Sequence, residues 1–366
     1  MRVLVFNAGS SSLKVSLVGA DDAELVSHEF KATSGRFARS ELKGAIDAMA
    51  GVDAVGHRVV HGGPRYSTGA VIDARLVAYL KKISDLAPLH MPAALSGILA
   101  IRRLLPRTPA VACFDTAFHS TLPPAAAAYA IPAKWRQRHG IKRYGFHGFS
   151  HAYSARRASE LMGRPQSQLR VVTCHLGAGA SLAAVDRGRS VDTTMGFTPL
   201  EGLVMATRSG SIDPGLMLWL QRHAGVTERE MTETLDARSG LLGLAGTKDM
   251  REILARKSEG DESAQLAFDV YIHRLRACIA SMAAAMNGLD ALVFTGGVGE
   301  NSPAVRADAA SALRFLGVEV DVTANSVLGG DGDISARRAT VRTLVVRARE
   351  DVEVAREVRR VLSAVS

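Results

Sequence analysis

The sequence predicts an α/β protein built from two similar domains, and three features favour this prediction. The chain has 366 residues, which is more than a single domain usually holds. Apolar residues make up 47% of it, enough for two cores, and they occur both in short β-branched runs and in helical periodicity. One pattern, an apolar strand followed by a turn of small residues and a second apolar strand, occurs near residue 1 and again near residue 170.

The first copy of this pattern spans residues 1–18. Residues 2–6 and 14–18 are apolar and partly β-branched, as in buried strands, and small polar residues separate them. Gly9 would let the backbone approach a ligand closely, because it has no Cβ. Three serines supply donors around one point and Lys14 adds a positive charge, a combination suited to phosphate. An ordinary serine-rich hairpin turn is the alternative.

The second copy spans residues 170–185, and its Gly177 aligns with Gly9 of the first. Two phosphate-type hairpins in separate halves indicate a duplicated architecture with a nucleotide bound between the halves. Neither turn fits the GxxxxGK[ST] pattern of a P-loop, and neither opens a helix as a dinucleotide fingerprint does. Gly177 and Gly179 form only a fragment of a GxG motif, so the inference depends on the repetition.

Charge and cysteine content narrow the classes of function. The formal charge is +9, and basic residues are scattered among acidic ones without the aromatic and basic clusters of nucleic-acid-binding proteins. We therefore expect small anionic substrates and no nucleic acid. The three cysteines are widely spaced, which fits a reducing cytoplasm better than a disulfide framework. The sequence shows no secretory h-region and no apolar run of about 18 residues, so we expect neither a signal peptide nor a membrane span.

In the first half, apolar β-branched runs predict strands and 3.6-residue periodicity predicts helices. A helix over 40–50 would end at Gly51, and another would begin with Pro92 in its first turn and end near residue 105. A helix over 73–86 follows from periodicity. Strands are predicted at residues 24–30, 52–60 and 110–114.

In the second half, the Pro- and Ala-rich residues 122–133 mark the expected boundary region. Ser150 is predicted to cap a helix over 151–162. Residues 197–215 form a long loop rich in turn residues, and such loops in compact domains are usually functional. Residues 290–303 predict a strand, a glycine turn and a helix start. Further strands are predicted at 190–195, 318–320 and 340–346, and further helices at 216–223, 228–237, 249–256, 262–287 and 350–362.

Several polar residues stand where ligand chemistry is expected. Asp115 follows a predicted strand, at the strand end where α/β sheets bind ligands, although a helix cap is the plainer interpretation. His147 lies between two glycines before a helix, and a structural loop histidine is its alternative. Arg208 lies among small residues in the long loop and could hold a phosphate or carboxylate with two hydrogen bonds. His57 and His61 are four residues apart, but a strand and a turn would not bring them onto one helical face, so we do not expect zinc.

Seven short motifs follow one another along the chain, at residues 7–14, 56–63, 114–119, 144–148, 175–179, 207–210 and 294–301. The first reads Asn7-Ala-Gly-Ser-Ser-Ser-Leu-Lys14 and the second Gly56-His-Arg-Val-Val-His-Gly-Gly63. In this order they resemble the signatures of the acetate kinase family of short-chain carboxylate kinases. Colinear motifs that span nearly the whole chain are far more specific than any one of them. They favour the functional interpretations of Asp115, His147 and Arg208.

The resemblance implies the fold of the actin-like and sugar-kinase-like superfamily. In that fold, two ribonuclease-H-like α/β domains enclose a nucleotide cleft, and the final helix returns to the first domain. We therefore expect domain one to comprise 1–117 plus 352–366, and domain two to comprise 118–351. The second domain would bind the nucleotide and would form the homodimer that the resemblance implies.

The resemblance also implies an activity, the reversible, ATP-dependent phosphorylation of acetate to acetyl phosphate by in-line transfer with Mg²⁺ or Mn²⁺. Acetate resembles a Glu side chain, whose pKa is about 4.3, so it is already ionised at pH 7 and needs no general base. Cations and fixed donors are needed instead, because an anion must approach a polyanion. Carried over motif by motif, the catalytic residues are Asn7, Arg58, Asp115, His147 and Arg208.

Further roles follow from the same resemblance. Arg58 and Arg208 would hold the carboxylate and the transferring phosphoryl group, and His147 would donate to the phosphoryl oxygens. The residues that would support the metal ion are Asn7, Asp115 and Glu350. The nucleotide-binding residues would be Lys14, His175, Gly177, Gly179, Asp249, Arg251, Gly297 and Gly299. The acyl pocket would be formed by Val60, Leu89, Phe146 and Pro199.

The sequence departs from the family pattern in several places. Ala178 stands where the second phosphate turn usually carries Asn, and we expect Ser181 or a water to supply the missing donor. Ser211 replaces an Asp, and Met91 replaces the Asn of a His-Asn-Pro loop. The chain is also shorter than usual before residue 50. A propionate or mixed acyl kinase, and a nucleotide-binding protein of this fold that has lost catalysis, are the alternative functions.

Overall fold

The computed structural model describes residues 1–8, 12–31, 39–49, 51–88 and 90–364. The chain forms two compact units. The first comprises Met1–Ser120, Phe146–Tyr153 and Arg349–Ser366, and the second comprises Thr121–Gly145 and Ser154–Ala348. These contacts assign residues 146–153 to the first unit, whereas the sequence placed all of 118–351 in the second domain. As boundaries of folding domains, the expected positions stay a prediction.

The first unit is built on a mixed sheet that, among the described residues, has six strands in the order β3-β2-β1-β4-β6-β5. β1, β2 and β3 form an antiparallel meander, and β1, β4 and β6 are parallel. The strands are β1 Val3–Ala8, β2 Ser12–Val18, β3 Glu24–Lys31, β4 Ala54–Val59, β5 Ala70–Val71 and β6 Ala110–Phe114. All the strands expected in this half are therefore confirmed, and the short β5 adds to them.

The second unit repeats this arrangement with the strand order β11-β12-β10-β7-β8-β9. Here β7, β8 and β9 form the antiparallel meander, and β7, β10 and β12 are parallel. The strands are β7 Arg170–Leu176, β8 Ala180–Asp186, β9 Arg189–Thr193, β10 Ala291–Thr295, β11 Gly332–Asp333 and β12 Arg342–Val345. The antiparallel pair β7 and β8 therefore corresponds to the pair β1 and β2 in the strand order, and the duplicated architecture is confirmed. The strand expected at 318–320 forms only isolated bridges.

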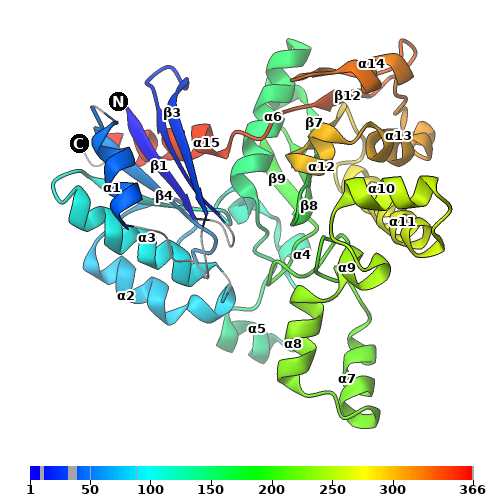
Figure 1. The fold of residues 1–366 in the computed structure, drawn as a ribbon, viewed down its shortest axis with the longest axis horizontal. Coiled ribbons are helices and arrows are strands. Elements are labelled where there is room, and N and C mark those ends of the chain that lie inside the picture. Colours follow the sequence, from blue (N-terminus) through cyan, green and yellow to red (C-terminus); the bar gives the residue numbers. More distant parts are fainter. Residues whose placement is uncertain (9–11, 32–38, 50, 89, 365–366) are drawn as a thin grey trace. The chain divides into compact units, whose positions relative to one another are not determined.

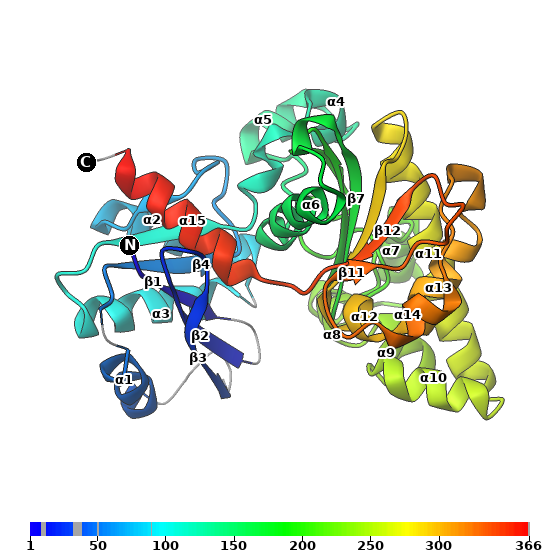
Figure 2. The same cartoon turned by 90° about the horizontal axis from the view of Figure 1, so that it is seen from above.

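Helices cover both faces of the first sheet (Figure 2). α3 (Met91–Leu104) packs on the face that carries Leu4, and α15 (Glu350–Ser363) packs on the face that carries Val3. Successive residues of a strand point to opposite faces, so the apolar residues 3–6 of β1 serve both layers. A Cβ on Gly56 would lie 2.8 Å from side-chain carbons of α15, so glycine is required for this close packing.

In the second unit, α11 (Glu262–Ala285) packs against β7, β8 and β9. Figure 2 shows α6 (Gly148–Met162) on the other side of that sheet. The remaining helices, visible in Figure 1, are α1 Arg39–Asp47, α2 Ala74–Lys82, α4 Pro124–Ala127, α5 Ala133–His139, α7 Pro214–His223, α8 Glu228–Ala237, α9 Gly240–Ala245, α10 Met250–Ser258, α12 Gly296–Asn301, α13 Pro303–Ser311 and α14 Val322–Val327. No helix within the described ranges is both long and apolar enough to cross a membrane.

Three further local expectations need correction. α6 begins at Gly148, so Ser150 lies inside the helix, fully buried, and does not cap it. The helix expected over 73–86 ends as an α-helix at Lys82 and continues after a break as a 3₁₀ turn. The glycine turn expected after β10 is itself helical and forms α12, because its residues continue directly into hydrogen-bonded turns.

Candidate functional site

Four of the predicted site residues lie together in the first unit. Asn7 is in β1, Arg58 is in β4, and Asp115 directly follows β6. These strands are parallel neighbours, so their carboxyl ends meet at one edge of the sheet. Glu350, the first residue of α15, completes the group. We call these four residues the arginine network.

The guanidinium of Arg58 is fixed by three partners. Its Nε and Nη2 donate to Asp115 Oδ1 at 2.8 Å and Oδ2 at 2.6 Å, the two-point geometry that matches arginine to a carboxylate. Its Nη1 donates to Asn7 Oδ1 at 2.9 Å and lies 3.5 Å from Glu350 Oε2. Asn7 Nδ2 in turn donates to Glu350 Oε2 at 3.3 Å. The pair is shielded, since 15% of the Arg58 side chain and 2% of the Asp115 side chain are exposed.

The charges of the arginine network favour a further cation. Burial lowers the pKa of Arg58, but attraction to Asp115 and Glu350 outweighs burial and raises it, so the guanidinium stays charged. Burial raises the pKa of Asp115 and Arg58 opposes the rise, and two hydrogen bonds from a permanent cation keep this carboxylate ionised. One cation then faces two carboxylates, and the net charge of the group is negative.

The donor set of the network fits Mg²⁺. Glu350 Oε2 accepts from Asn7 and faces Arg58, while its Oε1 takes part in no hydrogen bond among the described residues. Mg²⁺ is commonly held by one or two carboxylates together with waters and substrate phosphates. No cluster of three or more His, Cys, Asp and Glu side chains suited to a metal occurs in the described part of the chain. An open site at Glu350 is therefore the kind that these residues can form.

His147 has a strained backbone next to this network. Its φ of +56° lies in the left-handed region, which is costly for a residue with a side chain and is typical of functional sites. The following Gly148 donates its N–H to Asp115 O at 3.1 Å, and a Cβ there would lie 2.1 Å from the same oxygen. Only glycine allows this approach. The strained histidine is thereby tied to the residue that binds Arg58.

His119 supports the same turn and was missed by the sequence reasoning. It is 2% exposed, and its Nε2 lies 3.0 Å from Phe146 O, so Nε2 must carry the proton and donate. Burial lowers the pKa of His119 to about 4, which keeps the ring neutral at pH 7. The available signal was its position at the end of the motif over 114–119, four residues after Asp115.

Lys14 is paired away from the predicted phosphate turn. Its Nζ lies 3.0 Å from Glu24 Oε2. In the sheet, Asn7 lies opposite Lys14 and Val18 lies opposite Glu24, so the ammonium extends along β2 toward Val18. The turn itself, with Gly9, lies outside the described residues. A phosphate-binding role for Lys14 stays a prediction.

In the second unit, the turn between β7 and β8 carries the other predicted phosphate contacts. Gly177 donates its N–H to Gly179 O at 3.0 Å, which closes a tight turn after the half-buried His175. Ala178 is exposed, and its carbonyl accepts from Ala206 N–H at 3.1 Å. The turn is therefore held against the long loop that follows β9.

Ser181 does not fit the substitute role expected of it. It is fully buried in β8, so its hydroxyl is not presented at the surface on which Ala178 lies. The reason is the sheet, in which β8 lies between β7 and β9 with both faces covered. A water as the substitute donor stays a prediction.

Arg208 is the candidate anion-binding residue of the second unit. Its Nη1 donates to Pro199 O at 3.0 Å and lies 3.6 Å from Met205 Sδ. Burial lowers the pKa of Arg208, and the more distant Asp236 opposes this effect. No carboxylate lies within 4.0 Å of its guanidinium among the described residues. A half-buried cation without a carboxylate in contact is suited to a phosphate or carboxylate ligand.

The glycines after β10 have different structural roles. A Cβ on Gly297 would meet no protein atom within 4 Å, so the backbone there is open to a ligand. A Cβ on Gly299 would make only ordinary contacts. Gly296, which the sequence reasoning did not select, has a φ of +77°, and a Cβ there would lie 2.8 Å from Leu176 O. Gly296 is therefore the glycine that packing requires, and Gly297 is the one suited to ligand approach.

Arg306 donates hydrogen bonds to backbone carbonyls of α12, and the sequence reasoning did not select it. It is 1% exposed, and its Nη1 donates to Gly299 O at 2.9 Å and to Glu300 O at 2.7 Å. Its Nε and Nη2 donate to Asn325 Oδ1 at 2.7 Å and Asn325 O at 2.8 Å. These bonds satisfy carbonyls that the end of a helix leaves unpaired. The available signal was an arginine within the otherwise small and apolar start of α13.

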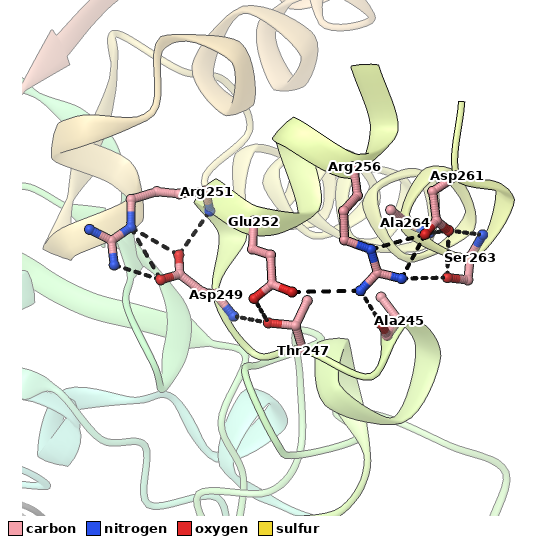
Figure 3. Close-up of polar contacts among 9 residues, drawn as sticks. All are labelled: Ala245, Thr247, Asp249, Arg251, Glu252, Arg256, Asp261, Ser263 and Ala264. Atoms are coloured by element: carbon pink, nitrogen blue, oxygen red, sulfur yellow. Dashed lines mark hydrogen bonds and ion pairs between the residues drawn. The ribbon is translucent and has the colours of Figure 1, made fainter. Parts of the chain in front are cut away.

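Asp249 and Arg251 bind each other at the start of α10, as Figure 3 shows. Asp249 caps the helix by accepting from Arg251 N–H at 2.9 Å, and its second oxygen accepts from Arg251 Nη2 at 2.5 Å. The hydrogen bonds from Arg251 lower the pKa of Asp249 to about 2. Both side chains are exposed, so a nucleotide contact is sterically open to them and stays a prediction.

The predicted acyl-pocket residues are distributed over both units. In the first unit, Val60 and Phe146 are buried, and the Phe146 ring lies 5.6 Å from the ring of His61. Pro199 is half-buried in the second unit. Leu89 lies outside the described residues. The pocket as a whole stays a prediction.

Comparison with known proteins gives consistent matches. A family model described as the acetokinase family matches residues 22–356. An acetate kinase from a Thermotoga species is 42% identical, with 100% of both chains covered. The structure of Porphyromonas gingivalis acetate kinase has a TM-score of 0.89 at 35% identity and covers 99% of each chain. A propionate kinase from Francisella tularensis has a TM-score of 0.91 at 36% identity, covering 98% of this chain and 99% of that one.

Proposed function

This chain belongs to the acetokinase family, whose reaction is phosphoryl transfer between ATP and acetate, and we propose that it forms acetyl phosphate by direct, Mg²⁺-dependent, in-line transfer. The observation that carries the proposal beyond family membership is the arginine network. Its four residues are far apart in the sequence, and hydrogen bonds connect them. A protein of this fold that had lost catalysis would have no need to maintain this arrangement.

In the first unit, Arg58 is the electrostatic centre of the proposed reaction. Acetate is ionised at pH 7, so catalysis must come from positioning and from stabilising the charge of the phosphoryl group in transfer. Asp115 and Asn7 hold the guanidinium in one orientation, which removes the cost of ordering it during the reaction. His147, held in its left-handed conformation, would donate to the phosphoryl oxygens.

Mg²⁺ would be held at Glu350, with Asn7 and Asp115 in support. The negative net charge of the arginine network and the Oε1 of Glu350 support this assignment. When bound, the ion would neutralise charge on the phosphate oxygens. Mn²⁺ takes similar oxygen ligands and would substitute for it.

In the second unit, Arg208 would bind the transferring phosphoryl group or the carboxylate. The absence of a carboxylate partner within 4.0 Å of it, in the described part of the chain, supports this role. The backbone of Gly177, Gly179 and Gly297 would approach the nucleotide, and the exposed Asp249 and Arg251 would contact its adenosine.

A hydroxamate assay with ATP, Mg²⁺ and a series of carboxylates tests the proposal. We expect acetyl hydroxamate to form only when ATP and a divalent cation are both present, and EDTA to abolish the signal until Mg²⁺ or Mn²⁺ is restored. Absence of product at saturating ATP and acetate would refute the proposed function. Activity that persists in EDTA would refute the metal requirement alone.

Propionate phosphorylation is the second candidate, because a propionate kinase is among the similar structures. Val60 is not reduced to a smaller residue, so we expect acetate to be preferred. One methylene in such a pocket is worth about 1–3 kcal/mol, and propionate should therefore still be used. An equal or higher kcat/KM for propionate would make propionate the substrate.

We further propose that the protein is a cytoplasmic homodimer. The second unit exposes three large apolar side chains on α7, namely Leu216 at 45%, Leu218 at 53% and Trp219 at 54%. Single exposed apolar residues are ordinary, but a group on one short helix supports contact with another chain. Sedimentation should give twice the chain mass, and Trp219→Glu should shift the protein toward the monomer. A monomeric wild-type protein would exclude the dimer.

A further inference from the structure

The loop that carries Pro199 is held by a cluster of polar side chains that no role described so far explains. Arg143 Nη2 donates to Glu201 Oε1 at 2.7 Å, and its Nη1 donates to Thr194 O and Met195 O, both at 3.1 Å. These bonds fasten the two ends of residues 194–201 to one guanidinium. We call Tyr129, Arg143 and Glu201 the loop clamp.

Tyr129 connects Glu201 of the loop clamp to the middle of the loop. Its hydroxyl donates to Glu201 Oε2 at 2.5 Å and accepts from Phe197 N–H at 2.9 Å. The packing leaves no space for adjustment, since a Cβ on Gly196 would lie 1.8 Å from Glu201 Oε2 and 2.1 Å from Tyr129 Oη. Burial, together with the bond to Glu201, raises the pKa of Tyr129 to about 12, so the hydroxyl keeps its proton at working pH.

The clamped loop acts directly on Arg208. Pro199 lies between Phe197 and Glu201, and its carbonyl accepts from Arg208 Nη1 at 3.0 Å. The hydrogen bond to this carbonyl is one of the few polar contacts that orient the guanidinium of Arg208, because no carboxylate lies within 4.0 Å of that guanidinium among the described residues. A shift of the loop would therefore move the Arg208 side chain.

We propose that Tyr129, Glu201 and Arg143 are positioning residues that fix the Pro199 carbonyl, and through it Arg208, for binding of the carboxylate substrate. The inference rests on the proposed function, since it assigns these residues to the acceptor side of that reaction. Loosening the clamp should weaken acetate binding and reduce the discrimination against propionate, while ATP binding by the glycine turns should be unaffected.

Tyr129→Phe tests the proposal with a conservative change that removes one oxygen. Because Phe197 N–H and Glu201 each lose a partner, we expect KM for acetate to rise about fivefold, the effect of roughly one hydrogen bond. We expect the ratio of kcat/KM for acetate to that for propionate to fall, and KM for ATP to stay unchanged. Glu201→Gln keeps an acceptor and should have a smaller effect than Glu201→Ala.

Tyr271→Phe is the matched control, since the Tyr271 hydroxyl is buried in the same unit with no hydrogen-bond partner among the described residues. Removing it should leave both KM values unchanged. If Tyr129→Phe matches this control in KM for acetate, the proposal is wrong. It is also wrong if KM for acetate and KM for ATP rise together, because a general structural defect would do that. A wild-type protein without kinase activity would instead overturn the proposed function.

Discussion

Removing Arg58 should cost stability as well as activity. From the sequence we would expect Arg58→Ala to keep an intact fold. In the structure, Arg58 is the partner of an Asp115 side chain that is only 2% exposed. Taking away one member of a buried ion pair leaves an uncompensated charge, which typically costs about 3–5 kcal/mol. We expect a loss near 3 kcal/mol for Arg58→Ala, because Asp115 can escape part of the cost by taking up a proton.

The double variant Arg58→Ala/Asp115→Ala separates the effect on stability from the effect on activity. It removes both charges, so it should be more stable than Arg58→Ala and yet equally inactive. Urea unfolding followed by circular dichroism measures the stabilities. Both tryptophans, Trp135 and Trp219, lie in the second unit, so their fluorescence reports on that unit as an internal control. As the urea concentration rises, we expect the circular dichroism of Arg58→Ala to show unfolding at a lower concentration than its tryptophan fluorescence does.

Two results would refute this reasoning. The free energy of unfolding of Arg58→Ala could lie within about 1 kcal/mol of the wild-type value, or the double variant could be no more stable than Arg58→Ala. Either result would mean that Arg58 and Asp115 are not a buried charge pair of the usual kind. Retention of more than about a tenth of wild-type turnover by Arg58→Ala would refute its catalytic role, since tenfold corresponds to only about 1.4 kcal/mol of barrier.

Three further predictions follow from single contacts. Arg208→Lys should lose at least about tenfold in kcat/KM, because lysine lacks the planar fork that can bind Pro199 O and an anion together; near-normal kinetics would contradict this. Ala178→Asn should leave kcat nearly unchanged, because we expect a water to supply the donor that the usual Asn would provide; a gain of about tenfold or more, the low end of the effect of a hydrogen bond to a charged oxygen, would contradict this. His57→Leu should make stability less sensitive to acid. Burial lowers the pKa of His57 to about 3 and that of His119 to about 4, so between pH 6.5 and 4 the unfolded chain binds protons that the folded protein does not. Stability therefore falls as pH falls, and losing His57 should reduce the slope by about 1.4 kcal/mol per pH unit in urea unfolding; an unchanged slope would exclude His57 as the cause.

The sequence by itself determined the local structure and its repetition. The hairpins at residues 1–18 and 170–185 were readable because strand, small-residue turn and strand are adjacent in the chain, and residue type alone sets their preferences. The order of the seven motifs along the chain indicated which residues belong to the candidate site. That order can be recognised without any knowledge of tertiary contacts. Local preferences and the order of motifs can both be obtained from a sequence, because neither depends on contacts between distant residues.

Tertiary structure alone decided how the site residues are held. Arg58 and Asp115 are 57 positions apart and Asn7 and Glu350 are 343 apart, so no local pattern could pair them. His119 and the loop clamp were invisible for the same reason, because each acts through a backbone group or side chain brought close only by folding. The start of α6 at Gly148 depends on one such contact, the bond to Asp115 O. Hydrogen bonds and buried charges act over a few ångströms of space regardless of chain distance, and only the packed sheets bring these groups within that range.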